Sequence, residues 1–173
     1  MGGYTLVLNE QHKTLISEGL LLARDEVLLS SAIIKDFLIL LEENKKPIKF
    51  SELVKILVNR GVKFKIITTP KMKTFYFFKN LKGFNDELIE FRFCARMHMK
   101  LLVVDTLFAY VGSANFTGAG LGMKGENKRN FEAGVVITNK KTISRLKKDF
   151  QEIWSGKKCM SCKLRNIVCE ASS

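Results

Sequence analysis

Four polar residues near the middle of the chain carry the functional groups that phosphoryl transfer requires. His98 and Lys100 are two positions apart, and Ser113 and Asn115 repeat that spacing. An imidazole can attack phosphorus or protonate a leaving oxygen, and an ammonium group neutralises phosphate charge. Hydroxyl and amide groups donate hydrogen bonds to the non-bridging oxygens. The four residues would form a phosphodiesterase site if the fold brought them together.

A β-hairpin is the element that could bring them together. In a strand spanning residues 97–104 alternate side chains would share a face, so the histidine and the lysine would lie on the same face. A turn centred near Thr106 would return the chain as a second strand. Antiparallel pairing would then place Gly112 to Asn115 opposite Met97 to Lys100. We therefore predict that the four polar residues converge at one end of the hairpin.

The full pattern resembles the HKD motif of the phospholipase D superfamily. It runs His98-x-Lys100, then Asp105 after four residues, then Gly112-Ser113-x-Asn115 after six more. Further along, Asn130-Phe131-Glu132 resembles the Asn-x-Glu strand that follows the motif in this family. The resemblance covers roughly residues 27–154. The alternative is a hydrophobic hairpin whose polar ends are incidental.

The resemblance implies a role for each of these residues. His98 would be the nucleophile and the general acid, while Lys100 and Asn115 would hold the phosphoryl oxygens with help from Ser113. Glu132 would orient an imidazole, with a plain surface salt bridge as the alternative. The family combines two motifs in one site without a catalytic metal, and this chain has one motif. The resemblance therefore implies a homodimer with a shared site.

Two further motif positions are interpreted from the backbone. Gly112 has no side chain, so it would let a substrate approach the main chain closely. Asp105 lies at the predicted turn, and strand alternation points its side chain away from the polar cluster. We therefore expect a structural role for Asp105.

The surrounding elements predict a single α/β domain with a mixed central β-sheet flanked by helices. Strands are predicted at residues 4–8, 27–33, 62–68, 88–93 and 130–137, and helices at 10–24, 36–41, 51–60 and 140–154. Residues 70–83 are the least regular stretch, in which lysines are interleaved with aromatic residues. This composition suits a groove for single-stranded nucleic acid, or a helix that buries its aromatic side chains under a basic surface.

The composition favours a basic, globular protein. The chain has 173 residues, of which 46% are hydrophobic, and a formal net charge of +12. Such a charge favours polyanionic partners, either nucleic acid or an anionic lipid surface. No signal-peptide pattern opens the chain and no apolar run reaches the ~18 residues of a membrane span, so we expect a cytoplasmic protein.

DNA or RNA is the favoured substrate, given the charge and the small size. A phospholipase D-type lipid headgroup hydrolase is the alternative enzyme, and it would need an exposed apolar entry surface. A nucleic-acid-binding module that has lost catalysis is a third possibility. The complete set of polar residues argues against that loss.

The C-terminal residues depart from the family pattern. We divide the chain into a catalytic domain at residues 1–156 and a basic, cysteine-rich tail at residues 157–173. The tail contains Cys159-x-x-Cys162 and Cys169, three thiols that could bind a structural zinc ion. A fourth ligand would come from Cys94, His12 or a partner chain. A redox-active or iron–sulfur role and an unstructured thiol tail remain alternatives, while a disulfide is disfavoured in the cytoplasm.

Overall fold

A seven-stranded mixed sheet forms the centre of the molecule, as the sequence predicted. The computed structural model describes residues 3–41, 46–70, 72–85 and 87–164. Its sheet order is β1-β9-β8-β7-β2-β5-β6, in which β2, β5 and β6 are parallel and the other neighbouring pairs are antiparallel. The strands are β1 (Tyr4–Leu8), β2 (Glu26–Ser31), β5 (Lys63–Thr68), β6 (Ile89–Phe93), β7 (Leu101–Val104), β8 (Phe108–Gly112) and β9 (Ala133–Ile137).

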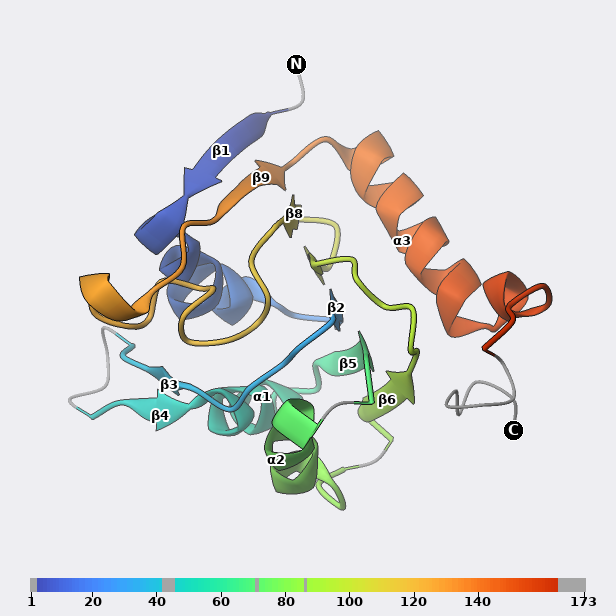
Figure 1. Cartoon of the computed structure of the whole chain (residues 1–173), viewed down its shortest axis with the longest axis horizontal. Helices are drawn as coiled ribbons and strands as arrows, with labels where there is room; N and C mark the ends of the chain where they lie inside the picture. Colours follow the sequence, from blue (N-terminus) through green and yellow to red (C-terminus); the bar gives the residue numbers. More distant parts are fainter. Residues whose placement is uncertain (1–2, 42–45, 71, 86, 165–173) are drawn as a thin grey trace.

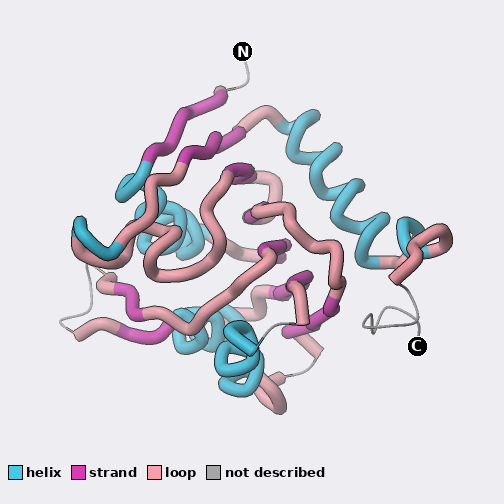
Figure 2. The backbone as a smooth tube through the Cα atoms, viewed as in Figure 1, coloured by secondary structure: helices cyan, strands magenta, loops and turns pink. Residues whose placement is uncertain are grey.

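Helices cover both faces of this sheet (Figure 1). One face carries α1 (Phe50–Asn59), α2 (Met72–Leu81) and three short helical turns, η1 (Asn9–Lys13), η2 (Leu15–Gly19) and η3 (Leu20–Leu22). The other face carries α3 (Lys140–Trp154), whose bounds agree with the predicted helix. The remaining elements are β3 (Leu38–Ile39), β4 (Ile48–Lys49), η4 (Glu126–Lys128) and η5 (Lys157–Cys159). Figure 2 shows how much of the chain between these elements is loop.

Strand β7 is buried on both faces, because the sheet separates two hydrophobic cores. Leu102 and Val104 belong to the core under α1 and α2, whereas Leu101 and Val103 belong to the core under α3. All four side chains are at most 1% exposed. This is why the strand is a continuous apolar run rather than an alternating one. The hairpin is thereby fixed between the two helical layers.

The hairpin has the predicted register, but its first strand is shorter than predicted. Leu101 pairs with Val111 and Val104 with Phe108, so the turn falls at residues 105–107. The predicted strand began at Met97. Instead, the amide of Met97 donates to the carbonyl of Cys94 at 3.0 Å, which turns the chain before it enters the sheet.

The turn between Cys94 and Met97 belongs to residues 94–100, which we call the crossing segment. Strand β6 lies at the edge of the sheet, and β5 and β2 separate it from β7. The crossing segment must therefore pass over the carboxyl ends of both intervening strands. It is held there by a hydrogen bond from the amide of Cys94 to the carbonyl of Thr68 at 2.8 Å. This path carries His98 and Lys100 over the end of the sheet.

The helix predicted at residues 36–41 is absent, and a strand takes its place. Phe37, Ile39 and Leu41 are buried, while Leu38 and Leu40 are more than half exposed, which is the period of a strand. A short continuous apolar run fits either period, so the sequence could not decide between them.

Asp36 lies where the predicted helix would have begun, and its side chain caps α1 instead. Its carboxylate accepts hydrogen bonds from the amide of Ser51 at 2.9 Å and from the Ser51 hydroxyl at 2.8 Å. An acceptor at this position satisfies one of the amides that the first turn of a helix leaves unpaired. The helix predicted at residues 51–60 is confirmed, and it ends before Gly61, whose φ of +90° is the left-handed conformation that favours glycine after a helix.

The structure also decides the form of two other stretches. Residues 70–83 contain the regular helix α2, which buries Phe77 and leaves Phe75 and Tyr76 exposed. The predicted helix at residues 10–24 is broken into the turns η1 to η3. The helical alternative for residues 70–83 is therefore confirmed for the backbone, with two aromatic side chains still facing solvent.

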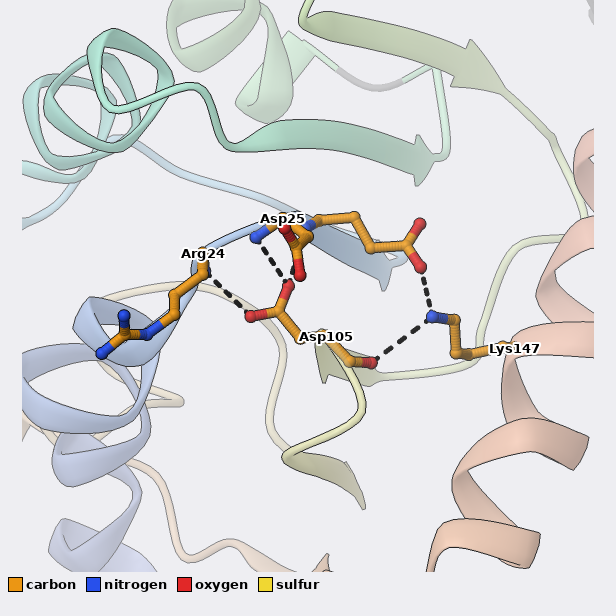
Figure 3. Close-up of polar contacts among 5 residues, drawn as sticks. Arg24, Asp25, Asp105 and Lys147 are labelled. Atoms are coloured by element: carbon orange, nitrogen blue, oxygen red, sulfur yellow. Dashed lines mark hydrogen bonds and ion pairs between the residues drawn. The ribbon is translucent and has the colours of Figure 1, made fainter.

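Asp105 fastens the hairpin turn to the start of β2 (Figure 3). Its carboxylate accepts hydrogen bonds from the amides of Arg24 at 2.8 Å, Asp25 at 3.0 Å and Glu26 at 2.7 Å. Its own φ is +50°, a conformation that Asp adopts more readily than most residues. The side chain of Lys147 on α3 contacts the Asp105 carbonyl and pairs with Glu26. Asp105 thus lies at the opposite end of β7 from His98.

Replacing Asp105 with alanine is expected to destabilise the fold by about 2–4 kcal/mol, because three backbone donors lose a charged acceptor. Chemical denaturation would measure the free energy of unfolding. Asn85→Ala is the matched control, since Asn85 also has a positive φ of 49°. That change carries the backbone strain alone, about 1 kcal/mol. Equal losses in the two variants would contradict a stabilising role for the carboxylate.

Candidate active site

The predicted polar residues gather at one edge of the sheet. The carboxyl ends of β2, β5, β6 and β8 and the amino ends of β7 and β9 all meet there, as the parallel and antiparallel pairings require. The crossing segment contributes His98 and Lys100, and the chain after β8 contributes Ser113 and Asn115. Glu132 immediately precedes β9, which begins three residues later than the predicted strand.

Lys100 is buried against His98. Its side chain is 6% exposed, and its Nζ donates to the carbonyl oxygen of His98 at 2.7 Å. The same Nζ lies 3.2 Å from Nδ1 and 3.3 Å from Nε2 of the imidazole. The ring of His98 is exposed. A positive charge is therefore fixed beside an accessible imidazole, which is the arrangement needed to bind a phosphate at a nucleophile.

Asn115 is oriented by the end of β2. Its Oδ1 accepts a hydrogen bond from the amide of Ile33 at 3.3 Å and lies 3.1 Å from Oγ of Ser31. A backbone amide can only donate, so this contact identifies the oxygen of the side-chain amide. The NH₂ group consequently points away from the amide of Ile33.

Ser31 is a positioning residue that the sequence analysis missed. Its Oγ also accepts from the amide of Phe116 at 3.2 Å, and it is fully buried. It therefore connects the end of β2 to Asn115 and Phe116. The signal was present in the sequence, because Ser30 and Ser31 end an otherwise apolar buried strand. Polar residues in such a position are buried only when they are hydrogen-bonded.

Ser113 and Glu132 are joined directly. The Ser113 hydroxyl donates a short hydrogen bond to Oε2 of Glu132 and accepts from the amide of Ala133 at 3.1 Å. Oε1 of Glu132 accepts from Nδ2 of Asn130 at 3.0 Å. Among the described residues of this chain, the Glu132 carboxylate thus contacts Ser113 and Asn130 rather than His98. Its role in orienting an imidazole stays a prediction.

Gly112 is required by packing beneath the site. A Cβ atom there would lie 2.2 Å from Oη of Tyr110 and 2.8 Å from the carbonyl oxygen of Ala133. Tyr110 is fully buried, and burial raises its pKa to about 12. A backbone contact with Ala114 opposes that rise, and the charge of Glu132 adds to it. The tyrosine therefore stays neutral and supports the hairpin end from below.

Three of the four cysteine residues lie in the described part of the chain. Cys94 and Cys162 line a cavity together with the buried Cys159, and Cys169 falls in the residues that are not described. Within residues 3–164 as described, no group of three or more His, Cys, Asp or Glu residues is arranged to hold a metal ion. The zinc site that includes Cys169 stays a prediction.

His12 was one candidate for the fourth zinc ligand, and the structure places it elsewhere. Its ring packs edge-on against Tyr110, with 5.4 Å between ring centroids, and Nδ1 lies 2.8 Å from the carbonyl of Asn9. Tyr110 belongs to the core on the sheet face opposite α3, whereas Cys159 follows α3. His12 is therefore a buried core residue rather than a ligand for this set.

The mixed sheet carries His98, Lys100, Ser113 and Asn115 at one end of its strands, and the comparisons identify the family that has this fold. Residues 20–154 match the family described as "Cardiolipin synthase, PLD-like domain". The chain therefore belongs to the phospholipase D-like family. The search of curated proteins found no match.

Solved structures show the same fold at low sequence identity. NucT from Helicobacter pylori has 15% identity and a TM-score of 0.66, covering 88% of this chain and 95% of that one. Nuc from Salmonella typhimurium, a phospholipase D family member, has 17% identity and a TM-score of 0.67, covering 89% and 95%. TrmBL2, an archaeal chromatin protein that binds DNA, has 21% identity and a TM-score of 0.52, covering 88% of this chain and 52% of that one. The chain thus shares its fold with these proteins over 88–89% of its length.

The helices also bear on membrane association. In the part of the chain that the structure describes, none of them combines the length and the apolar character of a transmembrane segment.

Proposed function

We propose that the protein is an endonuclease that cleaves DNA or RNA without a catalytic metal ion, through a phosphohistidine intermediate. The observation that carries the proposal is the buried ammonium of Lys100 against the exposed ring of His98. It supplies a fixed positive charge and a nucleophile at one point. The amide of Asn115 is oriented toward the same edge of the sheet.

The reaction is a double displacement in which one copy of His98 is the nucleophile and the other acts first as the general acid and then as the general base. A ring nitrogen of one His98 attacks phosphorus, the bond from phosphorus to the leaving oxygen breaks, and the other His98 gives its proton to that oxygen. Water then attacks phosphorus, the bond from phosphorus to the first imidazole breaks, and the second imidazole takes the proton from the water. Lys100 and Asn115 stabilise the charge on the phosphoryl oxygens, and Ser113 assists.

The mechanism requires a homodimer, because one chain supplies a single motif. A two-fold axis through the site edge would place two copies of His98 about one phosphate. Phe131 supports this location, since its side chain is 96% exposed directly beside Glu132. An aromatic side chain so exposed gains by being covered in an interface. The partner in this proposal is a second copy of the same chain.

Nucleic acid is favoured as the substrate by charge and by exposed aromatic residues. The chain carries a net charge of +12, and Phe75 and Tyr76 on α2 are 53% and 70% exposed. Bases can stack on such rings while cations contact the phosphates. TrmBL2, whose description states DNA binding, shares the fold. The family description names cardiolipin synthase, so a phospholipase D-type headgroup hydrolase is the second candidate.

Cleavage of the correct substrate is expected to survive chelation, because imidazole and ammonium groups do the work that Mg²⁺ does in other nucleases. The assay incubates the full chain in EDTA with labelled single-stranded and double-stranded DNA, RNA and phosphatidylcholine. Unchanged cleavage of a nucleic acid is the expected result. Circular dichroism in the same buffer separates lost chemistry from unfolding, should the tail require zinc.

Three other results would contradict the proposal. Full loss of cleavage in EDTA without unfolding, and its recovery with Mg²⁺, would exclude the metal-independent mechanism. Cleavage of phosphatidylcholine alone would favour the lipid hydrolase. Binding of nucleic acid without cleavage of any substrate would indicate an inert binding module.

A further inference from the structure

A cavity of about 320 Å³ adjoins His98 on the sheet face that α3 covers. One wall is the crossing segment, and the other is formed by the end of α3 and the turns that follow it, up to Cys162. The family match ends at residue 154. Lys158, Cys159 and Cys162 therefore enclose the cavity from the part of the chain that extends beyond the matched domain.

The cavity is lined mainly by sulfur and hydrocarbon groups, which suits a flat aromatic ligand. Thioether and thiol groups make favourable contacts with aromatic rings. The volume is at the lower end of the ~300–1,000 Å³ typical of small-ligand pockets, so one planar ring system fits better than a larger group. The apolar and sulfur-containing lining residues are Cys94, Met97, Met99, Ile153, Cys159 and Cys162.

Three charged residues border this apolar space, namely Arg96, Asp149 and Lys158. Lys158 is already paired, with Glu152 at 3.0 Å and with Asp149 at 3.9 Å. Arg96 is exposed, and its contact with Cys162 raises its pKa. Within the described ranges Arg96 makes no ion pair with a carboxylate. Its charge is therefore not neutralised by a carboxylate within the described ranges, and it could pair with an anion at the cavity.

We propose that the cavity is a nucleobase subsite, which holds the base of a nucleotide joined to the scissile phosphate while Arg96 contacts a neighbouring phosphate. Because His98 lines the same cavity, a base seated there brings its own phosphate to the imidazole. The proposal rests on the proposed nuclease function and adds the feature that recognises a nucleotide. The residues after the matched domain are then part of substrate recognition.

Cys162→Trp tests the subsite by filling it. The substrates are thymidylyl-thymidine and two analogues, each of which lacks one of the two bases. The wild type should cleave the dinucleotide about tenfold faster, in kcat/KM, than one of the analogues, the size expected for one stacked base. The variant should lose that advantage and keep the wild-type rate on the analogue. Met160→Trp is the matched control, because Met160 lies in the same turn and is 80% exposed.

A second variant tests the charge without disturbing the cavity. If Arg96 contacts a neighbouring phosphate, the wild type should prefer a dinucleotide with an additional terminal phosphate, at its 5′ or its 3′ end, over unphosphorylated thymidylyl-thymidine. Arg96→Gln should abolish that preference. Arg145→Gln removes the same charge from an exposed position on α3 and should retain the preference. This result does not depend on how well Cys162→Trp folds.

The failures of the subsite and of the nuclease function are distinguishable. If the wild type cleaves dinucleotides but ignores the missing bases, or if Cys162→Trp slows all three substrates equally while Met160→Trp does not, the subsite is overturned and the nuclease function stands. If the wild type leaves every dinucleotide and oligonucleotide intact but hydrolyses phosphatidylglycerol, both are overturned. A preference for extra phosphates that persists in Arg96→Gln removes Arg96 from the site.

Discussion

Replacement of His98 by asparagine is expected to lower phosphodiester cleavage by about 10³-fold or more, because the proposed reaction loses both its nucleophile and its general acid. The imidazole is exposed and makes its contacts with Lys100 of the same segment, so the fold should be retained. Steady-state cleavage of a labelled oligonucleotide measures the loss. Circular dichroism would show whether the variant is folded.

The same variant tests whether two chains share one site. Refolding equal amounts of wild type and His98→Asn should give about one quarter wild-type dimers, one half mixed dimers and one quarter variant dimers. A site that needs both imidazoles works only in the wild-type dimers. At the same total protein concentration, activity should therefore fall to about one quarter of that of pure wild type.

Two outcomes would contradict the shared site. If each chain held a complete site, about one half of the activity would remain. A monomer by light scattering under active conditions would have the same meaning. Lys63→Met is the control partner, because Lys63 is exposed at the amino end of β5, at the opposite edge of the sheet from His98. Its mixture with wild type should retain full activity.

Replacement of Lys100 by methionine is expected to lower kcat/KM by about 10²–10³-fold, the usual effect of removing one charged group that stabilises a transition state. Methionine retains an apolar, unbranched side chain, so the buried stem of Lys100 keeps its packing. Lys63→Met makes the same substitution on the surface and should change kcat/KM by less than about twofold. A small effect at Lys100 with an intact fold would show that its ammonium does not contact the reacting phosphate.

Stability measurements should accompany this experiment. Lys100 is buried, and its Nζ donates to the carbonyl of His98. Loss of this bond leaves a backbone acceptor unpaired, at a cost of about 1–3 kcal/mol. A loss of activity larger than the fraction unfolded would isolate the chemical role.

Local features of the sequence determined the hairpin and the α/β class of the fold. The turn of the hairpin lies where residues 105–107 predict it, and the pairing of Leu101 with Val111 follows from that turn alone. The bounds of α3 agree with its apolar stripe. These predictions succeeded because strand and helix periods and turn residues act between neighbours in the chain. The spacing of the motif likewise carried the chemistry of the proposed site.

Contacts between distant segments decided what the sequence left open. Asp36 caps a helix that begins fourteen residues later in the chain, and Ser31 contacts Asn115 across 84 residues. Strand β7 begins later than predicted, because the crossing segment must first pass over β5 and β2. Only the order of the strands in the sheet places those two strands in its path. The cavity beside His98 exists because the chain beyond α3 folds back against that segment. Such contacts depend on which surfaces meet once the sheet has formed, and no local pattern records that.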